Sequence, residues 1–377
     1  MEKKKVLHII KSLGRGGAEM LLQETMKIHN HEQFEFHCIY FLPWKNQMVE
    51  GISRAGGKVK LVEATNNISL LFKTRKVVDY IKANNIDIVH CHLPWAGFLG
   101  RIVSKIINVP VVYTEHNIQE RYHWLTRLLN KTTFNWQTKA IAVSGDVAKS
   151  IKDNIRPRIP VSIILNGVNT DSFIRNHELG SMKKRELKVE PAAVLIGNIA
   201  VFRFQKRLKE WITVFKQVHQ QHPHVRGCII GDGILKEEIL EHLRNEGMED
   251  YIFFPGLQTD VIPWLSAIDI FMMSSSFEGL PIALLEAMSM QCAVVSTNAG
   301  GIKEVIRNGE DGFIESVDDW KSLVKPLDFL ISHPEQIAEY GKKARQRVED
   351  SFSLRTMVNQ IEQLYQSLPE NAAKWKS

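Results

Sequence analysis

Short runs of branched apolar residues alternate with helix-like segments through most of this 377-residue chain. In the first half these runs are residues 6–10, 34–42, 58–64, 86–93 and 109–117. Such alternation predicts an α/β fold built on doubly wound parallel sheets. The carboxyl ends of strands in these sheets deliver side chains to a ligand site. Residues that directly follow each run are therefore the first candidates for function.

The composition is that of a globular protein large enough for two domains, since 44% of the residues are hydrophobic and 24% are charged. The cysteines occur singly, without the spacing of a zinc site or a disulfide framework, which indicates reduced thiols in a cytoplasmic protein. The basic opening MEKKKVLHII has too short an apolar run for a signal peptide, and no run approaches the ~18 apolar residues of a membrane span. Any membrane contact is expected to be peripheral.

Charge is distributed unevenly along the chain. Residues 1–165 hold 24 Lys and Arg against 13 Asp and Glu, a net of +11, and residues 166–377 hold 24 against 29, a net of −5, which together give the overall +6. A basic first half suggests an anionic partner such as a phospholipid surface or a pyrophosphate-linked acceptor. Nucleic acid is the other interpretation. It is disfavoured because no basic helix with DNA-binding spacing and no stacking-strand motif occurs.

A glycine loop follows the first apolar run, in KSLGRGGAE (11–19). Gly16 and Gly17 would let the backbone approach a ligand and direct N–H groups at an anion, although the same loop is also compatible with a simple turn. His116 and Asn117 lie at the carboxyl end of the run 109–117. A histidine at a strand end is either a catalytic group or a hydrogen-bonded structural one.

Residues 118–136, IQERYHWLTRLLNKTTFNW, mix aromatic and aliphatic side chains with cations. One interpretation is a basic, aromatic face for a membrane surface or a lipid-linked acceptor. The other is a helix that turns its apolar face to the core and leaves its cations solvated. The second is favoured because amphipathic helices usually pack inward.

Two cations, Arg203 and Lys206, follow the apolar run AVLIGNIAVF (193–202). At a strand end they could clamp a diphosphate, with the arginine giving a two-pronged contact and the lysine a point charge. The alternative is a solvated run of charge, because Arg207 and Lys209 lie alongside.

Two carboxylates flank the start of a predicted helix in SSSFEGLPIALLEAMSM (274–290). Glu278 precedes the helix, Pro281 suits its first turn, and Glu286 lies in an otherwise apolar stretch. Burying Glu286 is costly unless it is hydrogen-bonded, so it is expected to face polar hydrogens such as sugar hydroxyls. Glu278 would sit beside unpaired N–H groups, where a phosphate can also bind. Alternatively, Glu278 favours the helix dipole and Glu286 is a paired structural acid.

These motifs, in this order, resemble those of the family 4 retaining glycosyltransferases, which have the GT-B fold. The matching segments are GGAE, TEHN, NGV, RFQK, GDG, EGLPIALLE and AGGIKEV. The resemblance implies two Rossmann-like, doubly wound domains that face one another across a cleft. The acceptor-side domain would cover residues 1–165, together with a C-terminal helix of about 353–377 packed back on it. The nucleotide-sugar domain would cover residues 166–352.

The resemblance also implies catalytic roles for four side chains. Arg203 and Lys206 match the pair that holds the donor diphosphate. Glu278 matches the acid that contacts the transferred sugar, and His116 matches the histidine that contacts the donor hexose.

Further positions are implied in substrate binding. Glu286 matches the acid that holds the nucleotide ribose, and the amides of Gly279 and Leu280 would meet the diphosphate. The remaining substrate-binding positions are Gly16, Gly17, Asn117, Leu257 and Pro281. The chain departs from the family where it has Gln291 and Ala293 in place of a usual Gly and Pro, which makes the turn after the helix uncertain.

By resemblance, the reaction is transfer of a hexose with retention, from a nucleotide sugar, expected to be UDP-linked, to a hydroxyl of a glycan or lipid-linked acceptor. The setting would be bacterial cell-surface polysaccharide assembly, in the cytoplasm or peripherally at the inner membrane face, without a cofactor or metal. Two alternatives remain open at this point. One is a nucleotide-sugar epimerase or hydrolase on the same fold, and the other is a non-catalytic partner subunit.

Overall fold

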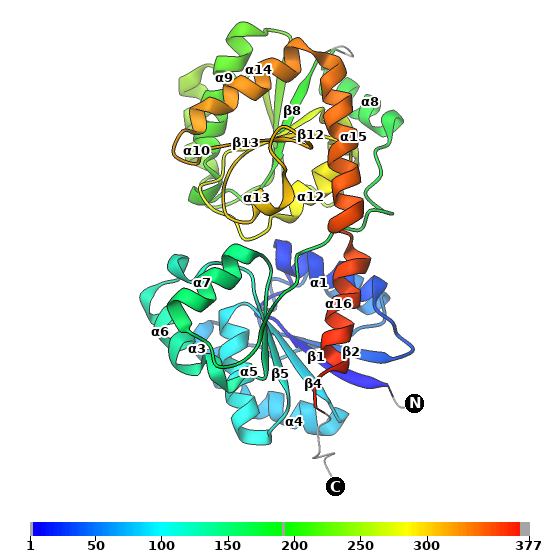
Figure 1. The fold of residues 1–377 in the computed structure, drawn as a ribbon, viewed down its shortest axis with the longest axis vertical. Helices are drawn as coiled ribbons and strands as arrows, with labels where there is room; N and C mark the ends of the chain where they lie inside the picture. Colours follow the sequence, from blue (N-terminus) through cyan, green and yellow to red (C-terminus); the bar gives the residue numbers. More distant parts are fainter. Residues whose placement is uncertain (1–2, 191–192, 370–377) are drawn as a thin grey trace. The chain divides into compact units, whose positions relative to one another are not determined.

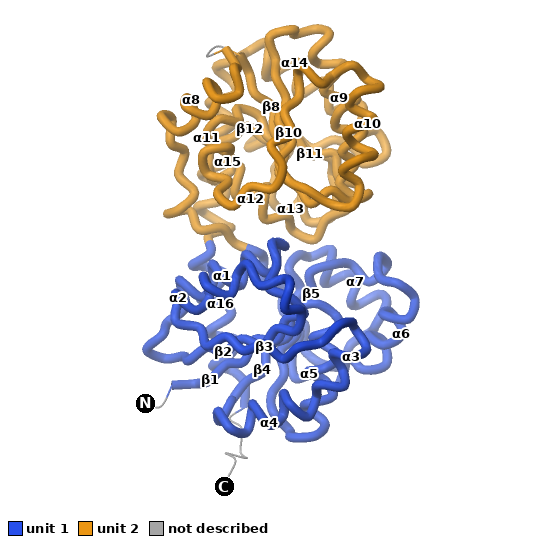
Figure 2. The backbone as a smooth tube through the Cα atoms, turned by 180° about the vertical axis from the view of Figure 1, so that it is seen from behind, with its two compact units in different colours: residues 1–166, 354–377 blue, residues 167–353 orange. Residues whose placement is uncertain are grey.

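The computed structural model describes residues 3–190 and 193–369, which form two compact units (Figure 2). Unit 1 contains the described residues up to Asn166 and those from Leu354 onward, and unit 2 is Gly167–Ser353. Each unit has one parallel sheet with helices between successive strands (Figure 1). The predicted α/β fold with two doubly wound, Rossmann-like units is thereby confirmed. The last part of the predicted C-terminal segment, residues 370–377, lies outside the described residues.

The sheet of unit 1 has its strands in the order β3-β2-β1-β4-β5-β6-β7, all parallel among the described residues. These strands are β1 Lys4–Ile9, β2 Phe34–Tyr40, β3 Lys58–Leu61, β4 Ile88–His92, β5 Val111–Glu115, β6 Lys139–Ala142 and β7 Val161–Ile163. The chain moves outward in opposite directions from β1 and β4. The topological switch point of this sheet therefore lies between those two strands.

Helices cover the sheet of unit 1 and bury its branched side chains. They are α1 Gly17–Ile28, α2 Val49–Arg54, α3 Asn67–Leu71, α4 Thr74–Asn84, α5 Pro94–Ile107, η1 Gln119–Arg121, α6 Trp124–Thr133, η2 Phe134–Trp136, α7 Gly145–Ile155 and α16 Leu354–Gln366. Helix α16 packs on α1, where Glu362 accepts hydrogen bonds from the ring of His29 (2.8 Å) and the backbone N–H of Asn30 (2.8 Å). The end of the chain thus belongs to the unit that contains its beginning.

Helix α6 is oriented differently from the sequence expectation. Its buried residues are the polar Thr126 and Asn130, whereas Trp124, Leu125 and Leu128 are exposed. The expectation of a core-facing apolar side was wrong because a buried arginine, Arg101, lies beneath the helix and needs polar partners. Among the helices of the described residues, none is long and apolar enough to span a bilayer.

The sheet of unit 2 has its strands in the order β10-β9-β8-β11-β12-β13, again parallel among the described residues. Its strands are β8 Leu195–Ile199, β9 Arg226–Ile230, β10 Ile252–Gly256, β11 Ile270–Met273, β12 Ala293–Thr297 and β13 Phe313–Glu315. Its helices are α8 His177–Glu186, η3 Phe204–Lys206, α9 Leu208–Gln221, α10 Lys236–Glu246, α11 Ile262–Ala267, α12 Ile282–Ser289, α13 Ile302–Val305, η4 Trp320–Leu323, α14 Val324–Ser332 and α15 Pro334–Ser351. The switch point lies between β8 and β11.

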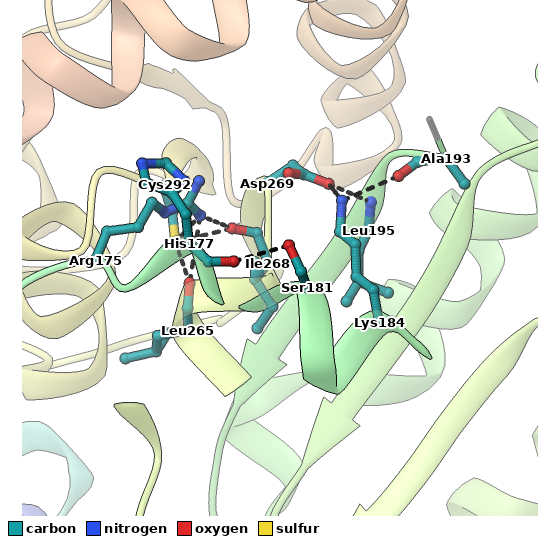
Figure 3. Close-up of polar contacts among 10 residues, drawn as sticks. All are labelled: Arg175, His177, Ser181, Lys184, Ala193, Leu195, Leu265, Ile268, Asp269 and Cys292. Carbon is teal, nitrogen blue, oxygen red and sulfur yellow. Dashed lines mark hydrogen bonds and ion pairs between the residues drawn. The ribbon is translucent and has the colours of Figure 1, made fainter. Parts of the chain in front are cut away.

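Polar anchors fix the first segment of unit 2 to the amino ends of its central strands (Figure 3). Asp269 accepts hydrogen bonds from the ammonium of Lys184 (2.7 Å) and from the backbone N–H of Leu195 (2.8 Å). Arg175 donates to the carbonyl oxygens of Leu265, Ile268 and Met290, so its cation lies at the carboxyl end of α11. These contacts hold β8 and β11 in register at their amino ends, opposite the loops that follow the two strands.

The turn after α12 keeps a left-handed backbone although it lacks glycine. Gln291, just beyond the helix cap Met290, has φ +58°. A residue with a Cβ costs about 1–2 kcal/mol more than glycine in this conformation. Glycine loses more conformational entropy on folding, which offsets part of this difference.

We therefore expect Gln291→Gly to stabilise unit 2 by about 0.5–1 kcal/mol and to raise its melting temperature by about 2 °C. Differential scanning calorimetry of the full chain measures this shift. Gln291→Ala is the control, because alanine keeps the Cβ and should give no gain. An unchanged or lower melting temperature for the glycine variant would show that the backbone of Gln291 is not strained.

Candidate functional site

Two loops at the switch point of unit 2 contain the residues with the strongest candidate chemistry. Residues 200–207 follow β8, and residues 274–281 follow β11. Because β8 and β11 are neighbours and parallel, both loops leave the sheet at the same edge. The sequence placed these loops about seventy residues apart, and the sheet order brings them together.

Lys206 and Glu278 form an ion pair across these loops. The ammonium nitrogen of Lys206 lies 2.6 Å from Oε1 of Glu278, and the side chains are only 19% and 10% exposed. Ser275 donates a second hydrogen bond of 2.6 Å to the same carboxylate oxygen. A charge-assisted contact that is partly shielded from water is stronger than an exposed one. The pair is therefore a preorganised site with one cation and one acid.

Hydrogen bonds between the loop backbones set the position of this pair. The hydroxyl of Ser274 donates to the carbonyl oxygens of Lys206 (3.1 Å) and Arg207 (2.8 Å), and the backbone N–H of Ser276 donates to Gln205 (2.8 Å). The rings of Phe204 and Phe277 lie 5.8 Å apart across the same junction. The geometry of the site therefore depends on the loops as well as on the two charges.

A third segment, after β12, packs directly under Glu278. Gly300 has φ +58°, and a Cβ at this position would lie 2.0 Å from the carbonyl oxygen of Glu278. The N–H of Gly301 donates to the carbonyl oxygen of Gly279 (2.9 Å). The hydroxyl of Thr297 donates to the carbonyl oxygen of Ser275 (2.6 Å). Gly300 and Gly301 belong to the segment AGGIKEV, for which the sequence indicated no specific role. Its role is to let the backbone approach the loop that contains Glu278.

The other candidates of unit 2 lie at different distances from this pair. Arg203 begins η3 with an exposed side chain, and no side-chain hydrogen bond or ion pair of it is found among the described residues. Glu286 is buried in the middle of α12, with 6% exposure. Leu257 is 53% exposed and follows β10, the edge strand, which β9 and β8 separate from β11. Glu286 thus lies on the helix that follows the loop of Glu278, whereas Leu257 lies at the edge of the sheet.

The amino end of α12 differs slightly from the sequence expectation. Pro281 is the residue before the first helical turn, with φ −74° and ψ 119°, and the helix begins at Ile282. Gly279 lies in the preceding loop with Leu280, whose side chain is buried. Pro281 was expected within the first turn. The difference is one residue, and its extended ψ is common for a helix-capping position.

The candidate site residues of unit 1 lie in the loops that follow β1 and β5. Gly16 caps α1 in an extended conformation and Gly17 is the first helical residue, so this helix begins in the loop after β1. His116 and Asn117 follow β5. The N–H groups of both donate to Oε1 of the buried Glu115, at 3.1 Å and 3.3 Å. The carboxylate of Glu115 thus fixes the start of the loop.

Glu115 has an unusual environment for an acid. Burial raises its pKa, while hydrogen bonds from Tyr122, Tyr113 and Gln119 act in the opposite direction. Burial also lowers the pKa of His116 to about 4, so this imidazole is neutral near pH 7. Its Nε2 is buried and has no hydrogen-bond partner among the described residues. A neutral ring with one free nitrogen can bind a hydroxyl group without adding charge.

A cluster of three buried histidines lies next to His116. Nδ1 of His8 is hydrogen-bonded to Nε2 of His92 (2.9 Å), and His90 is hydrogen-bonded to the hydroxyls of Tyr365 (2.5 Å) and Thr114 (2.7 Å). The rings of His92 and His116 have centroids 5.9 Å apart. All four histidines line one cavity of about 30 Å³.

Three of these four histidines form the cluster among the described residues whose geometry could suit a metal ion. Nitrogens of His8, His90 and His92 lie within 4.8 Å of one another. Burial holds the pKa of His8 and His90 well below the usual value and lowers that of His92 to about 3, so the rings are neutral, as metal ligands must be. However, hydrogen bonds use both nitrogens of His90 and join His8 to His92. We interpret the cluster as a hydrogen-bonded part of the core.

Comparison with known families matches both units. The model described as Glycosyltransferase Family 4 matches residues 15–172, and the model described as Glycosyl transferases group 1 matches residues 182–347. The chain is 25% identical over 317 residues to the Escherichia coli UDP-Gal:alpha-D-GlcNAc-diphosphoundecaprenol alpha-1,3-galactosyltransferase, covering 79% of this chain and 81% of the relative. It is 24% identical to the Staphylococcus aureus capsular polysaccharide biosynthesis glycosyltransferase CapM, covering 99% of this chain and 100% of the relative.

A solved structure shares the fold over almost the whole length. The crystal structure of Anabaena Alr3699/HepE in complex with UDP and glucose superposes with a TM-score of 0.86 at 21% identity, covering 97% of this chain and 100% of that one. At this level of identity the likeness extends to the fold alone.

The buried histidines predict an acid-sensitive unit 1. Their pKa values are lowered in the folded state relative to about 6.5 in an unfolded chain, so the unfolded state binds protons first as the pH falls. The free energy of unfolding therefore falls as the pH drops through 6.5, by at most about 1.4 kcal/mol per pH unit for each histidine that stays neutral in the folded state.

Urea unfolding of the full chain at a series of pH values measures this loss. The control is His224→Gln, which removes an exposed histidine of unit 2 and should leave the pH dependence unchanged. A free energy of unfolding that stays constant from pH 7 to pH 5 contradicts the neutral, buried state of the cluster.

Proposed function

The chain belongs to the family 4 glycosyltransferases, and on this premise we propose that it transfers a hexose, with retention, from a UDP-linked donor to a hydroxyl of a glycan or lipid-linked acceptor. The proposed setting is assembly of a bacterial cell-surface polysaccharide. The observation that carries the proposal is the ion pair of Lys206 and Glu278 at the switch point of unit 2. It supplies a cation for a departing diphosphate beside an acid for sugar hydroxyls.

The proposed reaction needs charge stabilisation at two places. As the bond between the anomeric carbon and the diphosphate oxygen breaks, the electron pair stays on the diphosphate, and the sugar becomes oxocarbenium-like. Lys206 and Arg203 would stabilise the first charge, together with the amides of Gly279 and Leu280 before α12. Glu278 would orient the sugar, and the acceptor hydroxyl would attack from the face the diphosphate leaves and pass its proton to the departing diphosphate oxygen. This route retains the anomeric configuration without a covalent intermediate.

In the free protein Lys206 and Glu278 neutralise each other. A donor diphosphate would compete for the ammonium of Lys206 and release the carboxylate of Glu278 to accept hydrogen bonds from the sugar. Ser275, which donates to the same carboxylate oxygen, would then keep Glu278 in place. Exchange of one partly buried ion pair for another limits the desolvation cost of donor binding.

The remaining candidates are proposed to bind the rest of the substrates. Glu286 would hold the ribose, and backbone near Leu257 would meet the base, while Pro281 orients the amides before α12. In unit 1, His116 and Asn117 would contact the hexose, and the loop of Gly16 and Gly17 would border the phosphates and the acceptor. Because Lys206 and Arg203 supply positive charge, we propose that transfer needs no divalent metal.

The acceptor and the location are also proposals. The name of the Escherichia coli relative describes a diphosphoundecaprenol-linked acceptor, and that of the Staphylococcus aureus relative describes capsular polysaccharide biosynthesis, which supports a lipid-linked acceptor here. The first 165 residues have a net charge of +11, which supports peripheral contact with an anionic membrane at its inner, cytoplasmic face.

We expect Lys206→Ala and Glu278→Ala each to lower the rate of sugar transfer by about 10² to 10³, because each removes a charged contact that strengthens in the transition state. Radiolabelled transfer to an acceptor lipid fraction measures this rate, with and without EDTA. The control is Lys209→Ala, since Lys209 lies on the neighbouring helix α9 and pairs with Glu238 on the surface. Near-normal transfer in either variant contradicts the assignment. Donor consumption without acceptor would indicate a hydrolase or epimerase instead.

Thermal-shift measurements with nucleotide diphosphates test the donor. UDP and UDP-sugars at about 100 times their dissociation constant should stabilise the parent protein by about 2.7 kcal/mol, and GDP or ADP by much less. Lys206→Ala should lose most of this shift while its melting temperature without ligand stays close to that of the parent. A larger shift with another base contradicts the UDP assignment. No shift with any nucleotide, and no turnover, would indicate a non-catalytic subunit.

A further inference from the structure

Helix α6 presents its apolar side chains to solvent. Trp124 is 67% exposed, Leu128 is 49% exposed and Leu125 is 41% exposed, whereas Thr126 and Asn130 face the interior. Exposing three large apolar side chains on one helix is unfavourable unless another surface covers them.

A buried arginine enforces this orientation. Arg101, which is fully buried on α5, donates hydrogen bonds to Asn130 (2.9 Å), Thr133 (3.0 Å) and Gln137 (2.7 Å). Asn130 in turn donates to Gln119 (2.9 Å). Turning the apolar side of α6 inward would leave the guanidinium of Arg101 without these partners, which costs several kcal/mol. The exposed apolar side is therefore built into the fold.

Cations accompany the exposed apolar residues. Arg127 and Lys131 are exposed on α6, and Lys131 follows Trp124 and Leu128 at helical spacing on one side of the helix. From residue 121 to residue 145 the sequence contains Arg and Lys but no Asp or Glu. The surface of α6 is thus both apolar and positively charged.

A second helix of unit 1 also exposes apolar side chains. Helices α3 and α6 both pack against α5. Phe72, which ends α3, is 82% exposed, and Ile68 on the same helix is 65% exposed. A single exposed apolar residue would need no explanation, but two helices that pack on α5 and share this pattern do.

We propose that α6 is the element of this protein that docks on an anionic lipid surface. Trp124, Leu125 and Leu128 enter the boundary between headgroups and acyl chains, and Arg127 and Lys131 pair with headgroup phosphates. Tryptophan and leucine beside cations suit this boundary, because it has apolar acyl chains on one side and hydrated headgroups on the other. The inference refines the membrane contact proposed above, but vesicle binding is measured without sugar transfer and can fail independently of it.

Vesicle sedimentation with the full-length protein tests the charge of the surface. The vesicles are phosphatidylcholine alone or phosphatidylcholine mixed with phosphatidylglycerol. Arg127→Gln with Lys131→Gln should weaken partitioning onto the anionic vesicles about thirty-fold, because each cation near such a surface contributes about five-fold. Lys325→Gln with Lys342→Gln removes two exposed cations of unit 2 and is the matched control, expected to bind like the parent.

The apolar contribution is tested at Trp124. Trp124→Ser should weaken partitioning about ten-fold, whereas Trp124→Phe should retain most binding but lose part of the fluorescence quenching by brominated acyl chains. Because Arg127 also donates to Asn154 (3.0 Å), the melting temperature of each variant is measured to show that the fold is kept. Lys206→Ala, which lacks transfer under the proposed function, should bind vesicles normally.

Parent-level vesicle binding by both the Arg127/Lys131 and the Trp124→Ser variants would overturn the proposal. So would equal binding to zwitterionic and anionic vesicles. Absence of vesicle binding by the parent would also overturn it and would direct attention to a protein partner for this surface.

Discussion

The parallel order of β8 and β11 is the constraint on which the candidate site of unit 2 depends. It places the ends of two distant segments at one edge of the sheet, and hydrogen bonds from Ser274 and Ser276 then join the loops. The contact between Lys206 and Glu278 forms only within that frame. An ion pair of this kind is weak evidence for stability, because desolvation offsets most of its attraction. Its position at a switch point makes a functional explanation preferable.

The two units share one architecture but have side chains of different charge at the ends of their strands. In unit 2 the loops present charge, with Lys206 and Arg203 as cations beside Glu278. In unit 1 the corresponding strand ends present the buried His92 and the half-buried His116, whose lowered pKa values keep both rings neutral near pH 7. A diphosphate needs positive charge, whereas sugar hydroxyls need neutral donors and acceptors. The loops of unit 2 therefore suit an anionic group, and the strand ends of unit 1 suit an uncharged one.

The sequence predicted both sheets, and it placed Lys206 and Glu278 just after strands, because those signals are local. It did not predict that the two side chains form an ion pair. Apolar runs determine strands, and a cation or an acid just after a run must lie at a strand end. The close approach of Gly300 to Glu278 could not be predicted, since it depends on where two loops meet in space. The orientation of α6 was predicted wrongly for a similar reason. Its helical pattern is unremarkable alone, and only the buried Arg101 of another helix reverses which side faces inward.

The network beneath α6 also reaches the loop of His116. Asn130 donates to Gln119, Gln119 donates to Glu115 (2.6 Å), and Glu115 accepts from the N–H of His116. The side chains of Asn130, Gln119 and Glu115 are buried, so a change in one hydrogen bond leaves an unsatisfied partner rather than a water-filled gap. The orientation of the exposed helix and the position of the histidine loop are consequently specified together. A surface that contacts lipid and a loop that contacts sugar would therefore share one rigid support.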